Sequence, residues 1–260
     1  MGKVRTLVLR VAGTNCDHET AYAFQLVGSE VELVHINQLF RREKRLSDYQ
    51  ILAAPGGFAY GDDISAGKAL ANELKFRLAD QIRQFIDDGK LILGVCNGFQ
   101  ALAKAGCLPG IKEGLRQEVA LFNSDTGTFQ CRWLYLKVSE NTNCVFTRGL
   151  SGVLEFPMAN GEGKFVPADD ASLQEMKANG QIVLQYCDCH GDLTPESNPN
   201  GSVEAIAGIC DPTGRVFALM PHPERHIHPT HHPRWTREAL KKEGDGVQIF
   251  RNAVEYAAKL

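Results

Sequence analysis

The chain has no long apolar run and no block of like charges. Its 260 residues carry 28 Lys and Arg against 31 Asp and Glu, which gives a formal net charge of -3. This near-neutral balance, without a basic tail, argues against a nucleic-acid-binding surface. No apolar stretch reaches the length of a membrane span, and residues 1–5 lead into the first apolar segment without a signal-peptide pattern. We therefore expect a cytoplasmic protein that binds neither nucleic acid nor membrane.

Two further absences concern cofactors and cross-links. No glycine-rich loop is followed by Gly-Lys-Ser or Gly-Lys-Thr, so the chain lacks a phosphate loop for ATP. The eight cysteines, in a cytoplasmic chain of this size, are expected to be thiols rather than a disulfide framework. We expect no cofactor in this chain.

Apolar runs alternate with helical patterns in the first half of the chain. Strands are expected near 4–11, 31–36 and 50–54, with a helix near 17–27. This alternation is typical of an α/β protein with a mostly parallel central sheet flanked by helices. From 66 to 88, leucine or isoleucine recurs every four residues, which predicts one helix whose apolar stripe faces the sheet.

The second half is β-rich and ends in a helix. Strand-like apolar runs lie at 132–138, 182–186, 203–209 and 215–220. A closing helix is expected over 244–260, with its apolar edge toward the core. The chain shows no internal repeat or linker, and 43% of its residues are hydrophobic. A single domain spanning 1–260 is therefore expected.

Cys96 lies between Gly94 and Gly98, where a buried strand is predicted to end and a helix to begin. Small residues two positions away on each side let a strand turn sharply into a helix and hold the middle side chain at a strained corner. At the helix N-terminus the dipole favours a thiolate, and the N–H of Asn97 would face a reaction oxyanion. The pattern predicts a nucleophile elbow, although a buried structural cysteine would also fit it.

A base and its orienting carboxylate are predicted far downstream, after the apolar run at 215–220. There a His-Pro-Glu sequence places His222 two residues before Glu224. A thiol nucleophile needs an imidazole to take and return its proton, and the imidazole needs a carboxylate to fix its tautomer. The prolines on both sides of His222 favour an extended segment, in which both side chains project to one side. A plain turn would also fit this short sequence.

The third motif is the glycine-rich loop that follows the strand near 50–54. Acyl transfer through a thioester needs a second N–H donor beside Asn97, and a Gly-Gly backbone after a strand can supply one. Gly57 is the candidate for this oxyanion hole. The alternative is an ordinary strand-to-helix loop.

Together these motifs resemble those of the class I (triad) glutamine amidotransferases, and they are most similar to the glutaminase subunits of phosphoribosylformylglycinamidine synthases. The resemblance is carried by Gly13 to Asp17, Pro55 to Asp62, Gly94 to Gln100, Gly161 to Gly163, and Met220 to Arg225. The sequences Gly-Val-Cys-Asn-Gly-Phe-Gln and Gly-Gly-Phe-Ala-Tyr-Gly-Asp are the specific ones, because other amidotransferases share only the elbow and the His-Pro-Glu.

The resemblance implies a flavodoxin-like fold and a thioester mechanism. Cys96 would attack the carboxamide of glutamine and release ammonia, while His222 moves protons and Glu224 orients it. Gln100 and Phe58 would contact the substrate. Ammonia would pass to a separate ATP-dependent synthetase subunit, which holds ATP and Mg²⁺ and makes formylglycinamidine ribonucleotide in de novo purine biosynthesis. A small accessory subunit is also implied.

One position departs from the family pattern. The family usually carries His-Gly-Glu-Gly, whereas this chain has Asn160 before Gly161, Glu162 and Gly163. A role that requires an imidazole at position 160 is thereby put in doubt, although Asn can still donate and accept hydrogen bonds.

Three other interpretations have to be considered at this stage. A metal site is suggested by the histidines at 222, 226, 228, 231 and 232, together with Cys187, Cys189 and His190. Structural zinc sites usually have two to four residues between paired cysteines, whereas Cys187 and Cys189 are separated by only one. No metal is therefore expected, and residues 226–235 are interpreted as a surface loop. A cysteine peptidase or other hydrolase on a related fold, or a binding subunit without activity, would also keep part of the pattern.

Overall fold

The computed structural model describes residues 3–112 and 114–260. A nine-stranded sheet runs through the molecule, in the spatial order β2-β1-β3-β4-β11-β10-β9-β6-β7. Its strands are β1 (Arg5–Arg10), β2 (Glu30–His35), β3 (Ile51–Ala54), β4 (Leu91–Val95), β6 (Gln130–Val138), β7 (Val153–Asn160), β9 (Ile182–Cys187), β10 (Ile206–Cys210) and β11 (Val216–Leu219). A second sheet pairs β5 (Val119–Asn123) with β8 (Glu162–Pro167).

The main sheet has a parallel part and an antiparallel part. The first five strands in spatial order, β2 to β11, are parallel. The remaining strands, from β10 to β7, each run antiparallel to their neighbour. The mostly parallel α/β sheet and the β-rich second half predicted from the sequence are both confirmed.

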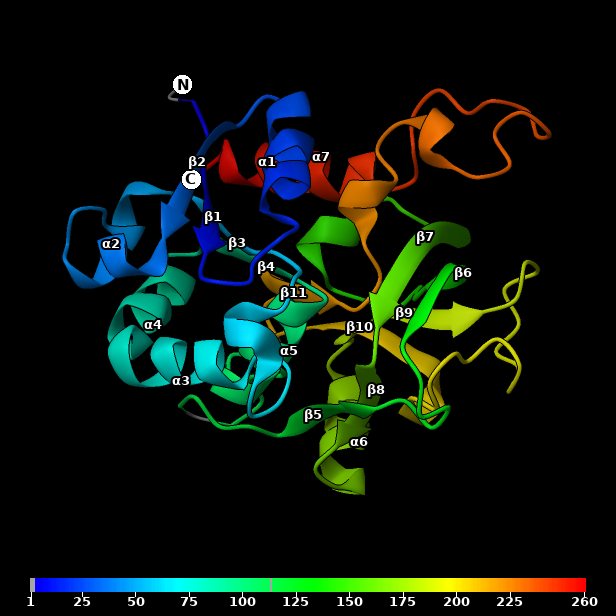
Figure 1. Ribbon diagram of the computed structural model, residues 1–260, viewed down its shortest axis with the longest axis horizontal. Helices are drawn as coiled ribbons and strands as arrows, with labels where there is room; N and C mark the ends of the chain where they lie inside the picture. The colour runs from blue at the N-terminus through cyan, green and yellow to red at the C-terminus, as the bar shows by residue number, and fades with distance from the viewer. Residues whose placement is uncertain (1–2, 113) are drawn as a thin grey trace.

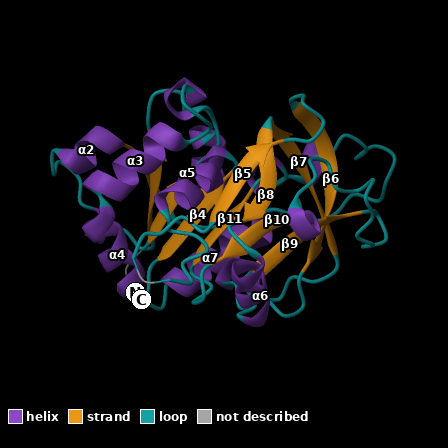
Figure 2. Cartoon of the chain, turned by 90° about the horizontal axis from the view of Figure 1, so that it is seen from below, coloured by secondary structure: helices purple, strands orange, loops and turns teal. Residues whose placement is uncertain are grey.

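Helices cover mainly the parallel part. They are α1 (Asp17–Leu26), α2 (Ile36–Phe40), α3 (Lys68–Arg77), α4 (Ala79–Asp87), α5 (Asn97–Ala105), α6 (Asp170–Ala178) and α7 (Val247–Ala257). Figure 1 shows α1 beside α7 above the parallel strands, with α3 and α5 below them. Every residue of β3, β4 and β11 is buried, as expected for parallel strands covered on both faces. In Figure 2 most helices lie on one side of the molecule, whereas β6 and β7 lie on the other.

One helix predicted from the sequence is two helices in the structure. The chain breaks at Leu78, whose φ of -120° and ψ of 6° are not helical, between α3 and α4. A repeat of four residues drifts by about 40° per step around a straight α-helix, so five such positions cannot all face one core. The break corrects this drift, because it lets both Leu74 and Ile82 become fully buried.

The predicted strand at 203–209 also needs correction. Residues Val203–Ala205 form a 3₁₀ turn, and only from Ile206 onward does the chain join the sheet as β10. Glu204 and Ala205 have positive φ angles of 48° and 55°, which no strand can contain. Within the described part of the chain, no helix combines the length and the apolar character that a membrane crossing requires.

Candidate active site

The candidate site lies at the carboxyl ends of the parallel strands. Cys96 directly follows β4, and His222 lies three residues after the end of β11. These two strands are neighbours in the sheet, and the N–H of Cys96 donates to the carbonyl oxygen of Leu219 at 2.8 Å. In parallel α/β sheets, ligands bind in the crevice outside these strand ends. The two side chains, 126 positions apart in the sequence, are thereby brought to one edge.

Cys96 has the strained backbone of a nucleophile elbow. Its φ is 51° and its ψ is -107°, a conformation that costs a non-glycine residue about 1–3 kcal/mol. A Cβ on Gly98 would collide with the carbonyl of Ala54, and one on Gly94 would lie 2.6 Å from the side chain of Leu102. The two glycines therefore let helix α5 pack directly on β3 and β4. This close packing is the steric reason for the glycines on both sides of Cys96 in the sequence.

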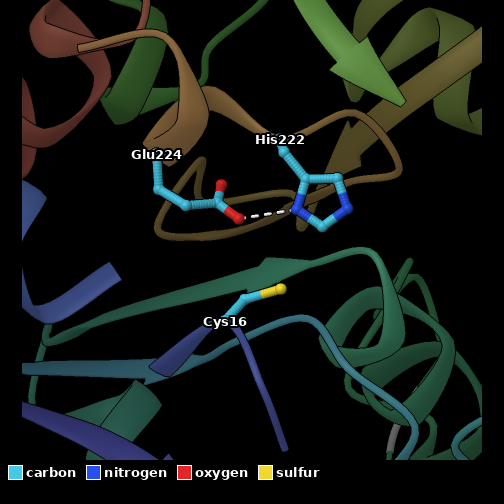
Figure 3. Close-up of side chains that lie close together, drawn as sticks. All are labelled: Cys16, His222 and Glu224. Atoms are coloured by element: carbon cyan, nitrogen blue, oxygen red, sulfur yellow. Dashed lines mark hydrogen bonds and ion pairs between the residues drawn. The ribbon is translucent and has the colours of Figure 1, made fainter. Parts of the chain in front are cut away.

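His222 and Glu224 form a buried pair. Nδ1 of His222 lies 2.6 Å from Oε1 of Glu224, and both side chains are almost completely buried (Figure 3). The backbone of His222 is extended, but Pro223–Arg225 forms a 3₁₀ turn, so the prediction of one extended segment is wrong. The turn brings the carboxylate back to the imidazole. The N–H of His222 donates to the carbonyl of Pro157 in β7 at 2.8 Å, which fixes the start of this turn.

The electrostatic surroundings keep His222 protonated more readily than usual. Burial alone lowers the pKa of the imidazole, but the negative charge of Glu224 and the neighbouring thiols of Cys96 and Cys16 raise it well above its ordinary value. Within the described residues, Nε2 of His222 has no hydrogen-bond partner. One ring nitrogen is thus held by the carboxylate while the other stays available for proton transfer.

Cys16 is a second cysteine at this site that the sequence analysis did not single out as functional. It follows β1, and its side chain points toward the His222–Glu224 pair (Figure 3). Its Sγ accepts from the guanidinium of Arg225 at 3.1 Å. Burial raises the pKa of the Cys16 thiol, and the proximity of His222 and Arg225 partly offsets this. Cys16 reaches this site only because β1 ends at the same edge of the parallel sheet as β4 and β11. This placement depends on the assembled sheet, so no local sequence signal marks Cys16 as part of the site.

Gly56 leaves the space in which these groups meet. A Cβ at this position would lie 2.8 Å from Cε1 of His222, 3.0 Å from Sγ of Cys16 and 3.4 Å from Cβ of Cys96. The three side chains therefore converge over a single glycine at the end of β3. Any larger residue would displace the imidazole or a thiol.

The glycine-rich loop after β3 packs closely against the loop after β1. Gly57 has a φ of 145°, and a Cβ there would lie within 2.9 Å of the backbone of Gly13, Thr14 and Asn15. Hydrogen bonds on both sides, from Phe58 to Gly13 and from Asn15 to Gly56, hold this segment against the loop after β1. Among the described residues, the N–H of Gly57 has no backbone acceptor. Gly57 remains a predicted oxyanion donor, as does the N–H of Asn97 at the first position of α5.

The side chain of Asn97 ties this loop to the elbow, which was not foreseen. Its Oδ1 accepts from the N–H of Ala59, and its Nδ2 donates to Asp62 and to Gln100, each at 2.9 Å. Burial raises the pKa of Asp62, while the bonds from Gly67 and Asn97 lower it in part. Asn97 thus joins the two segments from which both predicted oxyanion donors come.

A cavity of about 220 Å³ opens onto Cys96. Besides Cys96 it is lined by Gly57, Phe58, Asp62, Ala66, Gln100, Asn123, Phe129, Ala159, Asn160, Gly161 and Glu162. The predicted substrate contacts Gln100 and Phe58 are both among these residues. Phe58 is 46% exposed and stacks on Phe129 at the surface, with ring centroids 6.5 Å apart. Of the continuous run 159–162 in the wall, residues 160–162 were recognised in the sequence only as part of a family motif, and Ala159 was not recognised.

Among the described residues, two groups of side chains have ligand atoms close enough to share a metal ion. Cys16, His222 and Glu224 form one, and Glu155, His232 and Glu238 form the other, each with ligand atoms within 4.8 Å of one another. In the first, Glu224 already holds the imidazole. In the second, Arg234 contacts Glu155 at 2.8 Å and Glu238 at 2.6 Å, so its guanidinium already neutralises both carboxylates. Part of the donor set of each group is thus engaged by protein partners, whereas Nε2 of His222 and Oε2 of Glu224 have none among the described residues.

The histidine-rich segment is less exposed than predicted. His226 and His232 are buried and pack edge-on against Trp133, with centroid distances of 5.1 and 4.8 Å. Nδ1 of His226 lies 2.7 Å from the carbonyl oxygen of Glu155 in β7. The interpretation of 226–235 as a plain surface loop is therefore wrong for these two residues, because they anchor the segment to β6 and β7.

A family model for CobB/CobQ-like glutamine amidotransferase domains matches residues 3–257 of this chain. The chain belongs to this family of glutamine amidotransferases. The match extends through the elbow, the glycine-rich loop and the His-Glu pair described above.

Curated relatives and a solved structure give the closer likeness. The phosphoribosylformylglycinamidine synthase subunit PurQ of Dehalococcoides mccartyi is 50% identical over 100% of both chains, and that of Methanococcus maripaludis is 44% identical over 98% of both. A chain in the structure of PurLQS from Thermotoga maritima is 33% identical and superposes with a TM-score of 0.74, covering 98% of this chain and 99% of that one. The subgroup indicated by the sequence motifs is thus confirmed.

Proposed function

We propose that this chain is the glutaminase subunit of a phosphoribosylformylglycinamidine synthase and hydrolyses glutamine to glutamate and ammonia. The observation that carries the proposal is the strained Cys96, set beside a buried His222–Glu224 pair at the mouth of a cavity. The match to a glutamine amidotransferase family model supports the choice of glutamine as amide donor, and the full-length likeness to PurQ subunits supports the assignment to this synthase.

The proposed chemistry follows from this geometry. Sγ of Cys96 attacks the carboxamide carbon of glutamine, and Nε2 of His222 takes the thiol proton and delivers it to the leaving nitrogen, so that ammonia departs. The oxyanion is stabilised by the N–H groups of Gly57 and Asn97. Water then attacks the thioester, with His222 again moving the proton, and glutamate leaves. Glu224 holds the imidazole in the required tautomer throughout.

The ammonia is proposed to pass to a synthetase subunit, which carries ATP and Mg²⁺ and forms formylglycinamidine ribonucleotide. Support comes from the assembly in which the similar chain was solved, named PurLQS, and from the lack of a phosphate loop in this sequence. A small accessory subunit belongs to the same proposal. The cytoplasmic location stays a prediction.

We also propose that residues 1–260 form one domain. One sheet continues from β2 to β7, and its strands share a single hydrophobic core with the helices that cover them.

The test is glutamate production from glutamine by the purified chain, alone and with its synthetase partners, formylglycinamide ribonucleotide and ATP. Cys96→Ala should abolish glutamine hydrolysis, while the assembled complex still uses added ammonia. Loss of both activities in a folded variant would contradict separate sites for the two half-reactions. Glutamine hydrolysis that persists in Cys96→Ala would remove Cys96 from the mechanism.

A further inference from the structure

The wall of the cavity beside Cys96 carries more negative than positive charge. In the part of the chain that the structure describes, its charged lining residues are Asp62 and Glu162. Lys104 of α5 contacts this wall, with Nζ 3.5 Å from Oε2 of Glu162. Lys68 acts on the charge of Lys104 but forms no ion pair with either carboxylate among the described residues. Two carboxylates are therefore accompanied by one paired cation.

Lys104 and Glu162 neutralise each other and hold the loop between β3 and α3. Besides its contact with Glu162, Nζ of Lys104 donates to Oγ of Ser65 at 3.0 Å and to the carbonyl of Ala66 at 2.6 Å. These three acceptors match the donors of an ammonium group. The N–H of Ala66 in turn lies 3.2 and 3.1 Å from the two carboxylate oxygens of Glu162. The negative charge that stays uncompensated in the wall is that of Asp62.

One oxygen of Asp62 is used inside the protein and the other is not. Oδ1 accepts from the N–H of Gly67 and from Nδ2 of Asn97, both at 2.9 Å. Within the described residues, Oδ2 accepts no hydrogen bond and does not belong to the unpartnered atoms that are buried. The residue as a whole is only partly buried. Oδ2 is therefore an accessible anionic acceptor on a residue that lines the cavity.

The backbone that carries Asp62 is strained. Tyr60, Gly61 and Asp62 have successive positive φ angles of 55°, 73° and 55°. Such a conformation costs a non-glycine residue about 1–3 kcal/mol and persists only where the surroundings impose it, most often at ligand-binding and catalytic sites. Here the bonds from Gly67 and Asn97 impose it. The strain thus lies in the segment that presents Asp62 to the cavity.

Free glutamine has a group that matches this acceptor. Its α-ammonium group is cationic and can only donate hydrogen bonds, so it binds best to an anionic oxygen. Gln100, the other predicted polar contact, already accepts from Asn97 through Oε1 and donates to the carbonyl of Glu162 through Nε2. A glutamine residue inside a peptide has no α-ammonium group and could not make this ion pair.

We propose that Oδ2 of Asp62 binds the α-ammonium group of glutamine and so selects the free amino acid as the amide donor. This inference rests on the proposed glutaminase function and adds a specificity-determining residue to it. The α-ammonium group takes no part in cleavage of the carboxamide. The contact is therefore kept from the bound substrate to the transition state, and its loss should raise KM with little change in kcat.

The experiment compares Asp62→Asn with Asp63→Asn. Asn at position 62 keeps an oxygen to accept from Gly67 and Asn97, and replaces the unpartnered Oδ2 with an NH₂ group that repels an ammonium group. Asp63 is the matched control, because it is exposed and does not line the cavity. Glutamine binding is measured by calorimetry on the full chain carrying Cys96→Ala, and kinetics are measured on the assembled complex with Cys96 intact.

Asp62→Asn should weaken glutamine binding and raise KM by about 10-fold or more, with kcat changed by less than about threefold, because a hydrogen bond to a charged group is lost. Asp63→Asn should change each value by less than about twofold. The unfolding temperature of Asp62→Asn should stay close to that of the unsubstituted chain, since both internal bonds of the residue are kept.

Glutaramate, which is glutamine without its α-amino group, separates this role from a structural one. The unsubstituted site should prefer glutamine over glutaramate by about 10-fold or more, and Asp62→Asn should remove most of that preference. An aspartate that only supports the loop would leave the preference unchanged, because its loss would weaken both ligands alike.

The remaining outcomes overturn the inference. An unchanged KM in Asp62→Asn would show that the carboxylate does not contact substrate. Equal losses of affinity for glutamine and glutaramate, with a lowered unfolding temperature, would assign Asp62 to the fold of the loop, and a fall in kcat with KM preserved would assign it to the oxyanion-hole segment. If the unsubstituted complex shows no Cys96-dependent turnover although it uses ammonia, the proposed function itself has failed, which is a separate result.

Discussion

The parallel and antiparallel parts of the main sheet contribute to the site in different ways. Four parallel strands, β1, β3, β4 and β11, all end at the same edge and each places one segment there: Cys16, Gly56 with Gly57, Cys96, and His222. The antiparallel strands alternate in direction, so few of their ends reach this edge. They contribute the wall at 159–162 and the carbonyl of Pro157 that holds the backbone of His222.

The two parts of the main sheet therefore supply different kinds of groups to the site. The groups proposed to transfer protons or to bear the thioester lie after parallel strands, where successive βα loops converge by topology. The groups that line the substrate cavity from the other side come from one crossing between two sheets. We therefore expect substitutions of the proton-transfer and thioester groups to lower kcat, whereas those that alter the cavity wall, at the crossing or at Asp62, should raise KM.

After Cys96→Ala, the largest effect is expected from Glu224→Gln. The neutral amide keeps the size of the side chain but loses the charge that raises the pKa of His222 and stabilises its protonated form. We expect kcat for glutamine hydrolysis to fall by about 10³-fold, with KM little changed. Steady-state kinetics of the complex will test this, with ammonia-dependent synthesis as the control that should stay constant. An unaltered kcat would remove Glu224 from the triad.

Gly56→Ala tests most directly whether activity requires the close packing of His222 and the two cysteines over Gly56. The added methyl group would lie 2.8 Å from Cε1 of His222, so the imidazole must move. A displacement of a catalytic group by about 1 Å can lower kcat by about 10²-fold. Gly161→Ala is the matched control, because the nearest atom to its methyl group is 3.8 Å away in Phe129. Similar kcat values for the two variants would show that close packing over Gly56 is not required.

A smaller effect is expected from Asn97→Leu, which keeps the backbone N–H of residue 97 but removes the side-chain link to Ala59 and Asp62. The loop carrying Gly57 should then lose its register with the elbow. We expect kcat to fall by about 10-fold, less than the loss of an oxyanion donor itself. The unfolding temperature serves as the control for folding. A rise in KM with kcat preserved would instead show that Asn97 acts through Gln100 in the substrate cavity.

The sequence indicated the parallel part of the molecule better than the antiparallel part. Strands β3, β4 and β11 are continuous apolar runs, because both of their faces are buried, and such runs are visible without any partner. The glycines around Cys96 are equally visible, since their cause is local packing between α5 and the strands beneath it. These features needed no knowledge of tertiary contacts.

Strands of the antiparallel part were harder to predict, because individual residues interrupt their sequence patterns. In the structure, strand β7 alternates buried and half-buried residues along its whole length. In the sequence, however, Pro157 interrupts the run of residues that would otherwise predict a strand. Proline is tolerated there because β7 lies at the edge of the sheet and pairs only with β6. The place of Cys16 at the site could not be predicted either, because its side chain meets His222 and Arg225 only after distant strands have assembled.

The smallest effect concerns stability at the far edge of the parallel part, away from the site. Glu32 in β2 accepts hydrogen bonds from Lys44 and Arg5 at 2.6 Å and from Tyr49 at 2.8 Å. The bond from Lys44, aided by those from Tyr49 and Arg5 and opposed by burial, lowers the pKa of Glu32 from 4.5 to about 2. Glu32→Gln should lower the unfolding temperature at pH 7 by roughly 2–4 °C without changing kcat or KM.

The pH dependence of this difference provides the sharper test. A carboxylate whose pKa is lowered by folding contributes its stability above the unfolded pKa, and this contribution is lost as pH falls through the folded pKa. The gap between the unsubstituted chain and Glu32→Gln should therefore shrink between about pH 4.5 and pH 2, as followed by urea unfolding. Glu43→Gln is the control, because Glu43 lies on the surface and contacts Arg41 only at 3.8 Å. A stability difference that stays constant over this pH range would show that the shape of the Glu32 side chain, not its charge, stabilises this edge of the sheet. A loss of kcat in Glu32→Gln would show that this edge is coupled to the site.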